Sequence, residues 1–114
     1  MIGELYGVVL DCPDPMALAR FYRELCGGRI TPDGEWVDLV LASGVSIGFQ
    51  ACPGYVPPRW PGDDGDQQAH LDIRVPDLAA ADPAIRATGG RFLEAHDGFY
   101  VYLDPVGHPF CTVL

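Results

Sequence analysis

The spacing of apolar residues predicts a strand, a helix and three further strands in the first half of the chain. Residues 4–10 are mostly apolar, β-branched or aromatic, as in a strand. Apolar side chains then recur at helical spacing over residues 16–25. Asp14 is a good N-cap for this helix, and Pro15 suits its first position. The other strands are predicted around residues 29–31, 35–42 and 45–51.

The second half of the chain repeats this order. Residues 70–75 alternate as a strand, and Asp77 caps a helix that ends at about Thr88. Pro83 lies inside this helix, where we expect it to kink or shorten the first turns. Three more strands are predicted around residues 91–94, 99–103 and 109–113.

Identical residues support the repeat. Asp77 lies 63 residues after Asp14, and the Gly-Gly-Arg segment at 27–29 recurs at 89–91, where it ends the second helix as it ends the first. One half alone could not bury both a helix face and a sheet face well, so the two halves are expected to form one domain. The sequence therefore predicts an α+β protein made of two βαβββ modules.

One segment fits neither a helix nor a strand. Residues 53–68 are rich in Pro, Gly and Asp and are predicted to link module one (about 1–52) to module two (about 69–114). A stretch this long without regular structure is usually functional or disordered. Because it carries Tyr55 and Trp60, we expect it to cover a ligand cavity. Pinning the loop to the domain, or forming a dimer surface, are the alternatives.

The charge balance excludes some partners. The chain has 16 Asp and Glu against seven basic residues, all Arg, and a net charge of −9. Phosphate binding requires neutralising cations, so we expect no nucleic-acid or anionic-membrane partner. The acidic balance favours a cationic or neutral ligand, although it also serves solubility alone.

We predict the cellular location from targeting and membrane segments that we do not find in the sequence and from the spacing of the cysteines. The first residues have no basic segment followed by a long apolar one, and no run approaches the roughly 18 apolar residues of a membrane helix. The cysteines form neither a CxxC pair nor a zinc-finger spacing. We therefore expect a cytoplasmic protein with free thiols at Cys12, Cys26, Cys52 and Cys111.

Four segments together resemble one superfamily: Val8–Asp14, Ala19–Leu25, His70–Val75 and Asp104–Phe110. Over nearly the whole chain they are similar to the vicinal oxygen chelate superfamily, also called the glyoxalase/bleomycin-resistance/dioxygenase family, and to its glyoxalase-like branch. The resemblance implies two βαβββ modules that form a curled mixed sheet around a cavity. In metal-dependent members, side chains from four strands hold a divalent metal that chelates two vicinal substrate oxygens.

The resemblance places the family's four ligand positions at Gly7, Gln50, His70 and Cys111. Gly7 has no side chain, Gln50 is a weak ligand, and Cys111 stands where metal-dependent members usually carry Glu. Because metal sites in proteins need at least three good ligands, we expect no resident cofactor. A divalent metal, if one binds, would be held by His70 and Gln50 with Asp11 or Asp72.

His70 is the main candidate for acid–base chemistry, since its unperturbed pKa is about 6.5. Asp72 shares its strand face and is expected to orient the ring. The resemblance places Cys111 nearby, so His70 could activate its thiol. A structural histidine and an inert core thiol are the alternatives. Trp36 and Trp60 are expected to stack on a cationic ligand.

Three functions stay open at this point. The first is a metal-independent protein that binds a cationic or aromatic small molecule and sequesters a drug or metabolite, as the bleomycin-resistance branch implies. The second is a metal-dependent lyase, isomerase or dioxygenase of the vicinal oxygen chelate type. The third is a metal-free enzyme using His70 with Cys111. The incomplete ligand set, the aromatic loop and the acidic charge favour the first, in a homodimer.

Overall fold

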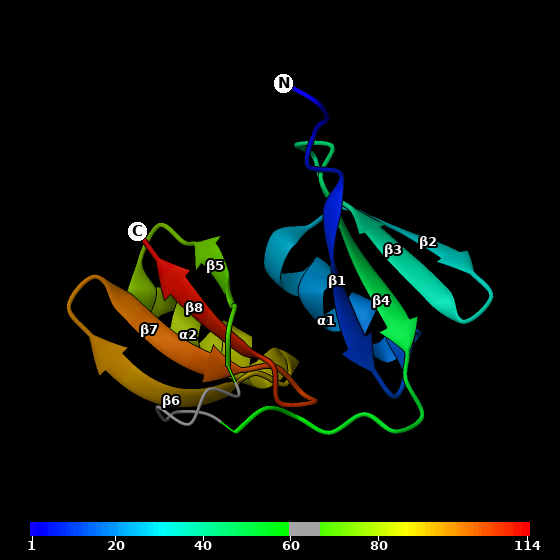
Figure 1. Ribbon diagram of the computed structural model, residues 1–114. Helices are drawn as coiled ribbons and strands as arrows, with labels where there is room; N and C mark the ends of the chain where they lie inside the picture. Colours follow the sequence, from blue (N-terminus) through cyan, green and yellow to red (C-terminus); the bar gives the residue numbers. More distant parts are fainter. Residues whose placement is uncertain (60–66) are drawn as a thin grey trace. The chain divides into compact units, whose positions relative to one another are not determined.

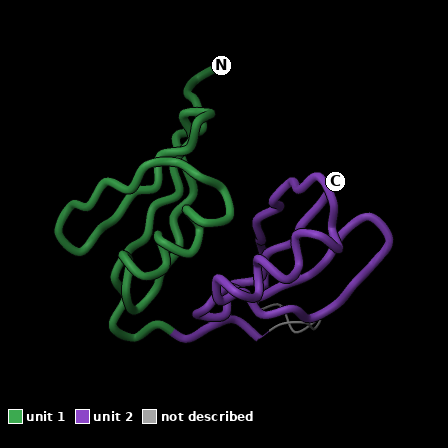
Figure 2. The backbone as a smooth tube through the Cα atoms, turned by 180° about the vertical axis from the view of Figure 1, so that it is seen from behind, with its two compact units in different colours: residues 1–55 green, residues 56–114 purple. Residues whose placement is uncertain are grey.

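The computed structural model describes residues 1–59 and 67–114 and contains two modules, each with one helix and one four-stranded sheet (Figure 1). Figure 2 colours the two compact units, residues 1–55 and 56–114, here called the first and second module. Each has the order βαβββ, so the predicted α+β class and the two βαβββ modules are confirmed. Among the described residues, no helix combines the length and hydrophobicity that crossing a bilayer requires.

The first module builds a mixed sheet in the order β1-β4-β3-β2. β1 runs parallel to β4, and the other neighbours are antiparallel. The sheet leaves β1 and β2 at its edges. Its elements are β1 (Gly7–Cys12), α1 (Pro15–Cys26), β2 (Arg29–Asp33), β3 (Trp36–Val40) and β4 (Ser46–Ala51).

Helix α1 covers one face of this sheet. Its start is fixed as predicted, because the Asp14 side chain accepts a hydrogen bond from the backbone N–H of Ala17 at 3.2 Å. Gly27 ends it with a φ of 69°, in the region that favours glycine. The buried Tyr22 ring stacks on Phe49 of β4, with centroids 5.8 Å apart. By strand alternation, the neighbours of Phe49 along β4 therefore face away from the helix.

The second module repeats the arrangement with the sheet order β5-β8-β7-β6. β5 runs parallel to β8, again at the edge of the sheet. Pro57, from the segment assigned to the linker, clusters with this module and lies against Gly107. The elements are β5 (Leu71–Arg74), α2 (Leu78–Thr88), β6 (Arg91–His96), β7 (Phe99–Leu103) and β8 (Pro109–Val113).

Helix α2 begins directly after its cap. The Asp77 side chain accepts a hydrogen bond from the N–H of Ala80 at 2.9 Å. Pro83 lies inside the helix but does not shorten its start, which follows the cap immediately as in α1. The helix is tied to the sheet by Tyr102 of β7, whose hydroxyl donates to Asp82 at 2.8 Å. The Tyr102 ring stacks on Phe110 of β8 at 5.2 Å, so this side of the sheet is the core.

The strand boundaries agree with the sequence pattern to within two residues, except at the start of β1. β7 and β8 have the predicted bounds, whereas β1 begins at Gly7 rather than residue 4 and continues to Cys12. Its pairing with β4 starts at Gly7 opposite Ser46, and Leu5 and Tyr6 are exposed. The apolar pattern therefore located this strand but not its start.

Candidate functional site

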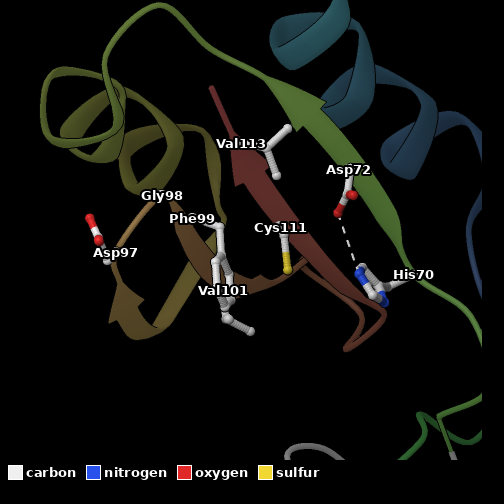
Figure 3. Close-up of a pocket in the computed structure, with 8 residues that line it drawn as sticks. All are labelled: His70, Asp72, Asp97, Gly98, Phe99, Val101, Cys111 and Val113. Carbon is white, nitrogen blue, oxygen red and sulfur yellow. Dashed lines mark ion pairs between the residues drawn. The ribbon is translucent and has the colours of Figure 1, made fainter.

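A pocket of about 450 Å³ lies on the sheet face of the second module opposite α2 (Figure 3). Tyr102 and Phe110 point to the helix side, so their strand neighbours Val101 and Cys111 point into the pocket. The remaining lining residues are His70, Asp72, Asp97, Gly98, Phe99 and Val113. All eight belong to the second module, which forms this pocket by itself.

Strand register places the lining side chains together. Asp72 of β5 is the direct neighbour of Cys111 on β8, and Cys111 is the neighbour of Val101 on β7. Phe99 and Val113 form the next pair toward the β6–β7 turn. Paired residues point to the same face of a sheet, so a row of three strands delivers one carboxylate, one thiol and an apolar wall. Strand alternation brings every second side chain to this face, and the parallel pairing of β5 with β8 places Asp72 beside Cys111.

His70 lies just before β5 and faces Asp72, as strand alternation predicts. Its Nε2 atom is 3.3 Å from Asp72 Oδ1, and its Nδ1 atom is 3.0 Å from Gln67 Nε2. An amide nitrogen only donates, so Nδ1 accepts and the ring proton resides on Nε2. The Nε2 atom lies within ion-pair distance of the Asp72 carboxylate. Gln67, which sequence reasoning did not single out, therefore helps to set the tautomer of His70.

The thiol of Cys111 lies at the buried end of the pocket and is only 7% exposed. Burial first, and then the Asp72 charge, raise the pKa of this thiol above its ordinary value. At neutral pH it is a protonated thiol. A nucleophilic cysteine requires the opposite shift, so the local electrostatics oppose activation of Cys111 by His70.

Three groups that can ligate a metal converge at the polar end of the pocket. One nitrogen of His70, one oxygen of Asp72 and the sulfur of Cys111 all lie within 4.8 Å of one another. Imidazole, carboxylate and thiolate are the ligands of zinc-type sites, and a metal bound by them would act as a Lewis acid. These donors fit a divalent metal. Sequence reasoning paired His70 with Asp72 and with Cys111 but did not combine all three as one ligand set, since the meeting of Asp72 with Cys111 depends on the pairing of β5 with β8.

The other predicted residues lie on the first module. Asp11, Gln50 and Trp36 are neighbours across β1, β4 and β3, on the face opposite α1. The Trp36 indole nitrogen donates to Asp38 Oδ1 at 2.9 Å, a carboxylate that the sequence did not mark. Tyr55 donates its backbone N–H to a carbonyl oxygen of the same module, that of Cys52, at 3.0 Å. The participation of these residues in one site with His70 stays a prediction.

Trp60 lies outside the described residues, so its predicted contact with a ligand stays a prediction.

The fold and the site together define a glyoxalase-like protein. The glyoxalase-like domain family matches residues 7–113, and the chain belongs to that family and to the vicinal oxygen chelate superfamily. The resemblance stated from the sequence is confirmed. No curated protein matches the sequence.

Solved structures of similar fold agree with this assignment. The genomically encoded fosfomycin resistance protein FosX of Listeria monocytogenes superposes with a TM-score of 0.75 at 13% identity, covering 99% of this chain and 93% of that one. A glyoxalase/bleomycin resistance protein/dioxygenase family enzyme of Burkholderia phytofirmans PsJN gives 0.71 at 22% identity, covering 98% and 100%. FosX of Mesorhizobium loti gives 0.68 at 10% identity, covering 99% and 92%. At these identities the likeness concerns the fold alone.

Proposed function

We propose that this chain binds a small molecule with an apolar or aromatic body and a cationic group in the pocket of the second module, and sequesters it without a metal. The observation that carries the proposal is the division of the pocket into two ends. Phe99, Val101 and Val113 form an apolar wall, and His70 and Asp72 form a polar end. A volume of about 450 Å³ lies in the range of small-molecule sites.

The charges at the polar end select the ligand class. Asp72 and Asp97 are the ionised groups among the lining residues, which include neither Lys nor Arg. The buried thiol of Cys111 is protonated at neutral pH, because its pKa is raised. A ligand cation meets the carboxylates of Asp72 and Asp97 here and no Lys or Arg in the lining, and the net charge of −9 acts in the same direction.

The apolar wall supplies the remaining affinity. Phe99 is 37% exposed and stacks on the His96 ring with centroids 4.6 Å apart, so the part of its ring that His96 does not cover is available to a ligand. Each Å² of apolar surface removed from water contributes about 25 cal/mol, so covering this wall favours an aromatic or aliphatic body over a compact ion. A ring face also attracts cations.

Calorimetric titration of metal-free protein with benzylamine and benzyl alcohol tests the proposal. These probes share an aromatic body and differ in charge. We expect benzylamine to bind more tightly, and Asp72→Asn to reduce its affinity by about fivefold with little change for benzyl alcohol. Glu24→Gln is the matched control, because Glu24 is an exposed carboxylate on helix α1 of the first module and does not line the pocket. Equal binding of both probes to the unmodified chain would contradict the proposal.

A second copy of the chain is the protein partner that we propose. β1 ends the first sheet and exposes Val8 by 38% and Val9 by 48%. An uncovered apolar edge strand favours association. Light scattering after gel filtration tests this, with a mass of two chains expected and Val9→Lys expected to reduce it.

A second candidate function is a metal-dependent lyase, isomerase or dioxygenase of the vicinal oxygen chelate type. The convergence of His70, Asp72 and Cys111 favours it. Among the similar folds, the E126Q mutant of Listeria FosX was solved in complex with Mn(II) and a dihydroxypropylphosphonic acid. Turnover of hemithioacetals, epoxides or catechols that needs added metal and disappears in His70→Ala would support this candidate over sequestration.

A further inference from the structure

We infer that the ligand of this pocket carries two cationic groups, one at each end of an apolar spacer, as a long-chain diamine does. The inference rests on the proposed function and adds the second charge of the ligand and its length. It is carried by the positions of Asp72 and Asp97, the two carboxylates among the lining residues.

The two carboxylates lie on opposite sides of the pocket (Figure 3). Asp72 belongs to the edge strand β5, whereas Asp97 lies in the turn between β6 and β7. Figure 3 shows Phe99, Val101 and Cys111 between them. A ligand that reaches both carboxylates must therefore cross the apolar wall.

The strand register sets the distance between the two carboxylates. Because β8 separates β5 from β7, Asp72 lies about 10 Å from Val101, the residue level with it on β7. Asp97 precedes Val101 by four residues, of which the first two form the turn, and this adds about 11 Å along the strand. Asp72 and Asp97 are thus about 15 Å apart, and an ion pair at each end takes up about 3 Å of that span. The two cationic groups of the ligand are then about 9 Å apart.

The apolar wall selects the spacer between the two charges. Phe99, Val101 and Val113 remove alkyl groups from water, which favours a long hydrocarbon chain over a polar one. An extended chain advances about 1.2 Å per bond, so the nitrogen atoms of diaminobutane are about 6 Å apart and those of diaminooctane about 11 Å. Diaminooctane can therefore reach both carboxylates with a slight bend, whereas diaminobutane is too short.

The other charged groups beside the pocket leave Asp97 as the second anchor. Glu94 is the neighbour of Val101 on β6, but its carboxylate lies 2.7 Å from the imidazole of His96. Within the described residues, Asp97 takes part in no ion pair. Arg74, the neighbour of Val113 on β5, is exposed and does not line the pocket.

The turn holds Asp97 at the rim of the pocket. His96 pairs with Phe99, so the turn consists of Asp97 and Gly98 alone. Gly98 has a φ of 90°, in the region that favours glycine, and this allows the chain to reverse at once. A short turn between paired strands loses little conformational freedom when a ligand binds, which favours an ion pair at this position.

Calorimetric titration of the chain with octylamine, diaminooctane and diaminobutane tests the inference. Octylamine and diaminooctane share the same hydrocarbon body and differ by one ammonium group. We expect diaminooctane to bind about five- to tenfold more tightly than octylamine, which exceeds the roughly twofold gain from two equivalent ends alone. Diaminobutane should bind more weakly than diaminooctane. High salt should reduce the gain, since exposed charges are screened.

Substitutions at the two carboxylates assign the two ends of the ligand. Asp97→Asn should lower the affinity for diaminooctane to about that for octylamine and leave octylamine unchanged, whereas Asp72→Asn should weaken both. Glu94→Gln tests the neighbouring carboxylate and should have little effect. Glu24→Gln, at an exposed carboxylate on helix α1, is the control for net charge.

Two results would overturn the inference: equal affinities for octylamine and diaminooctane, or a loss of diaminooctane binding in Glu94→Gln as large as that in Asp97→Asn. Circular dichroism of each variant confirms that it is folded, and both Asp72 and Asp97 are exposed. The monoamines separate this inference from the proposed function. Binding of octylamine and benzylamine without a gain for diaminooctane rejects the second charge alone, whereas failure of every amine to bind rejects the sequestration proposal itself.

Discussion

The two modules share one fold, but their open faces carry polar side chains at different positions: Asp11, Asp38 and Gln50 in the first module, and His70, Asp72 and Cys111 in the second. His70, Asp72 and Cys111 correspond, 63 residues earlier, to Gly7, Val9 and Gly48. The registers agree, because Val9 pairs with Gly48 as Asp72 pairs with Cys111. Every ligand atom of the second module thus has an apolar or empty counterpart in the first.

Two of the three counterpart positions in the first module, Gly7 and Gly48, are also closed to side chains. A Cβ atom on Gly7 would collide with the carbonyl oxygen of Ser46. A Cβ atom on Gly48 would lie 2.7 Å from Cζ2 of Trp36, the residue that corresponds to Phe99. The indole covers the position that the thiol of Cys111 occupies in the second module. The repeat therefore keeps the scaffold, while a glycine and an indole stand in the first module where the second has a cysteine and a phenyl ring.

The largest predicted effect tests how far the modules depend on each other. Phe110→Ala removes a fully buried ring that stacks on Tyr102 in the second module. We expect it to lower the free energy of unfolding by about 3–5 kcal/mol. Because we expect one domain, urea unfolding should shift equally by circular dichroism and by Trp36 fluorescence in a Trp60→Phe background. Separate transitions for the two probes would show that the modules unfold independently.

Gly48→Ala sharpens the comparison between the two open faces. The added methyl group would displace the Trp36 indole, which is hydrogen bonded to Asp38 at 2.9 Å. We expect a loss of about 1–3 kcal/mol in urea unfolding. In a Trp36→Ala background the indole is absent, so the same substitution should cost much less. An equal cost in both backgrounds would mean that the backbone, and not the indole, requires glycine at this position.

The helices of the two modules are held differently, and Tyr102→Phe tests the difference. Tyr102 donates to Asp82, which also accepts from Arg86 at 3.0 Å, whereas the corresponding residue of the first module is the buried Leu39. We expect a loss of about 1–2 kcal/mol at pH 7. The loss of stability caused by a conservative Leu39→Val change should not vary with pH, because Leu39 has no ionisable partner of this kind.

The sign of that pH dependence follows from Asp82. Burial raises the pKa of its carboxyl, but the hydrogen bonds from Arg86 and Tyr102 outweigh it and leave the pKa lowered. A lowered pKa contributes stability above the unfolded value of about 3.9 and loses it as the pH falls further. The difference between the parent chain and Tyr102→Phe should therefore shrink below pH 4. A difference that stays constant would contradict this account.

The sequence predicted those features that depend on residues close together in the chain, namely the helix starts, some strand bounds and the contact of His70 with Asp72. Asp14 and Asp77 marked both helix starts because a cap acts within three residues. The bounds of β7 and β8 followed from apolar runs between turns. The contact of His70 with Asp72 followed from alternation within one segment.

The contacts that the sequence did not predict depend mostly on pairing between strands that are distant in the chain. Cys111 meets Asp72 only because β5 runs beside β8, and no local pattern specifies that register. The same limit hid the packing of Trp36 over Gly48, which joins β3 to β4. Gln67 was not found because its contact with His70 depends on the loop conformation before β5. Local sequence patterns thus identified most residues of the polar cluster, but only the family resemblance placed Cys111 near His70, and neither predicted the pairing of Cys111 with Asp72.

The smallest predicted effect concerns the thiol that distinguishes the second module. Burial and the Asp72 charge both raise the pKa of Cys111, so its thiolate fraction at pH 8 should be below that of a simple thiol. Iodoacetamide reacts with the thiolate, so alkylation of Cys111 should be slow at pH 8 and accelerate above pH 9.

Asp72→Asn tests the contribution of the carboxylate charge to the raised pKa of Cys111. The variant removes this charge but leaves the thiol buried, so we expect alkylation at pH 8 to become only about two- to fivefold faster. Peptide mass spectrometry assigns the modified cysteine, and Glu24→Gln, at an exposed carboxylate on helix α1, serves as the charge-matched control. If both variants accelerated the reaction equally, the effect would belong to net charge, and the pairing of Asp72 with Cys111 would not be its cause.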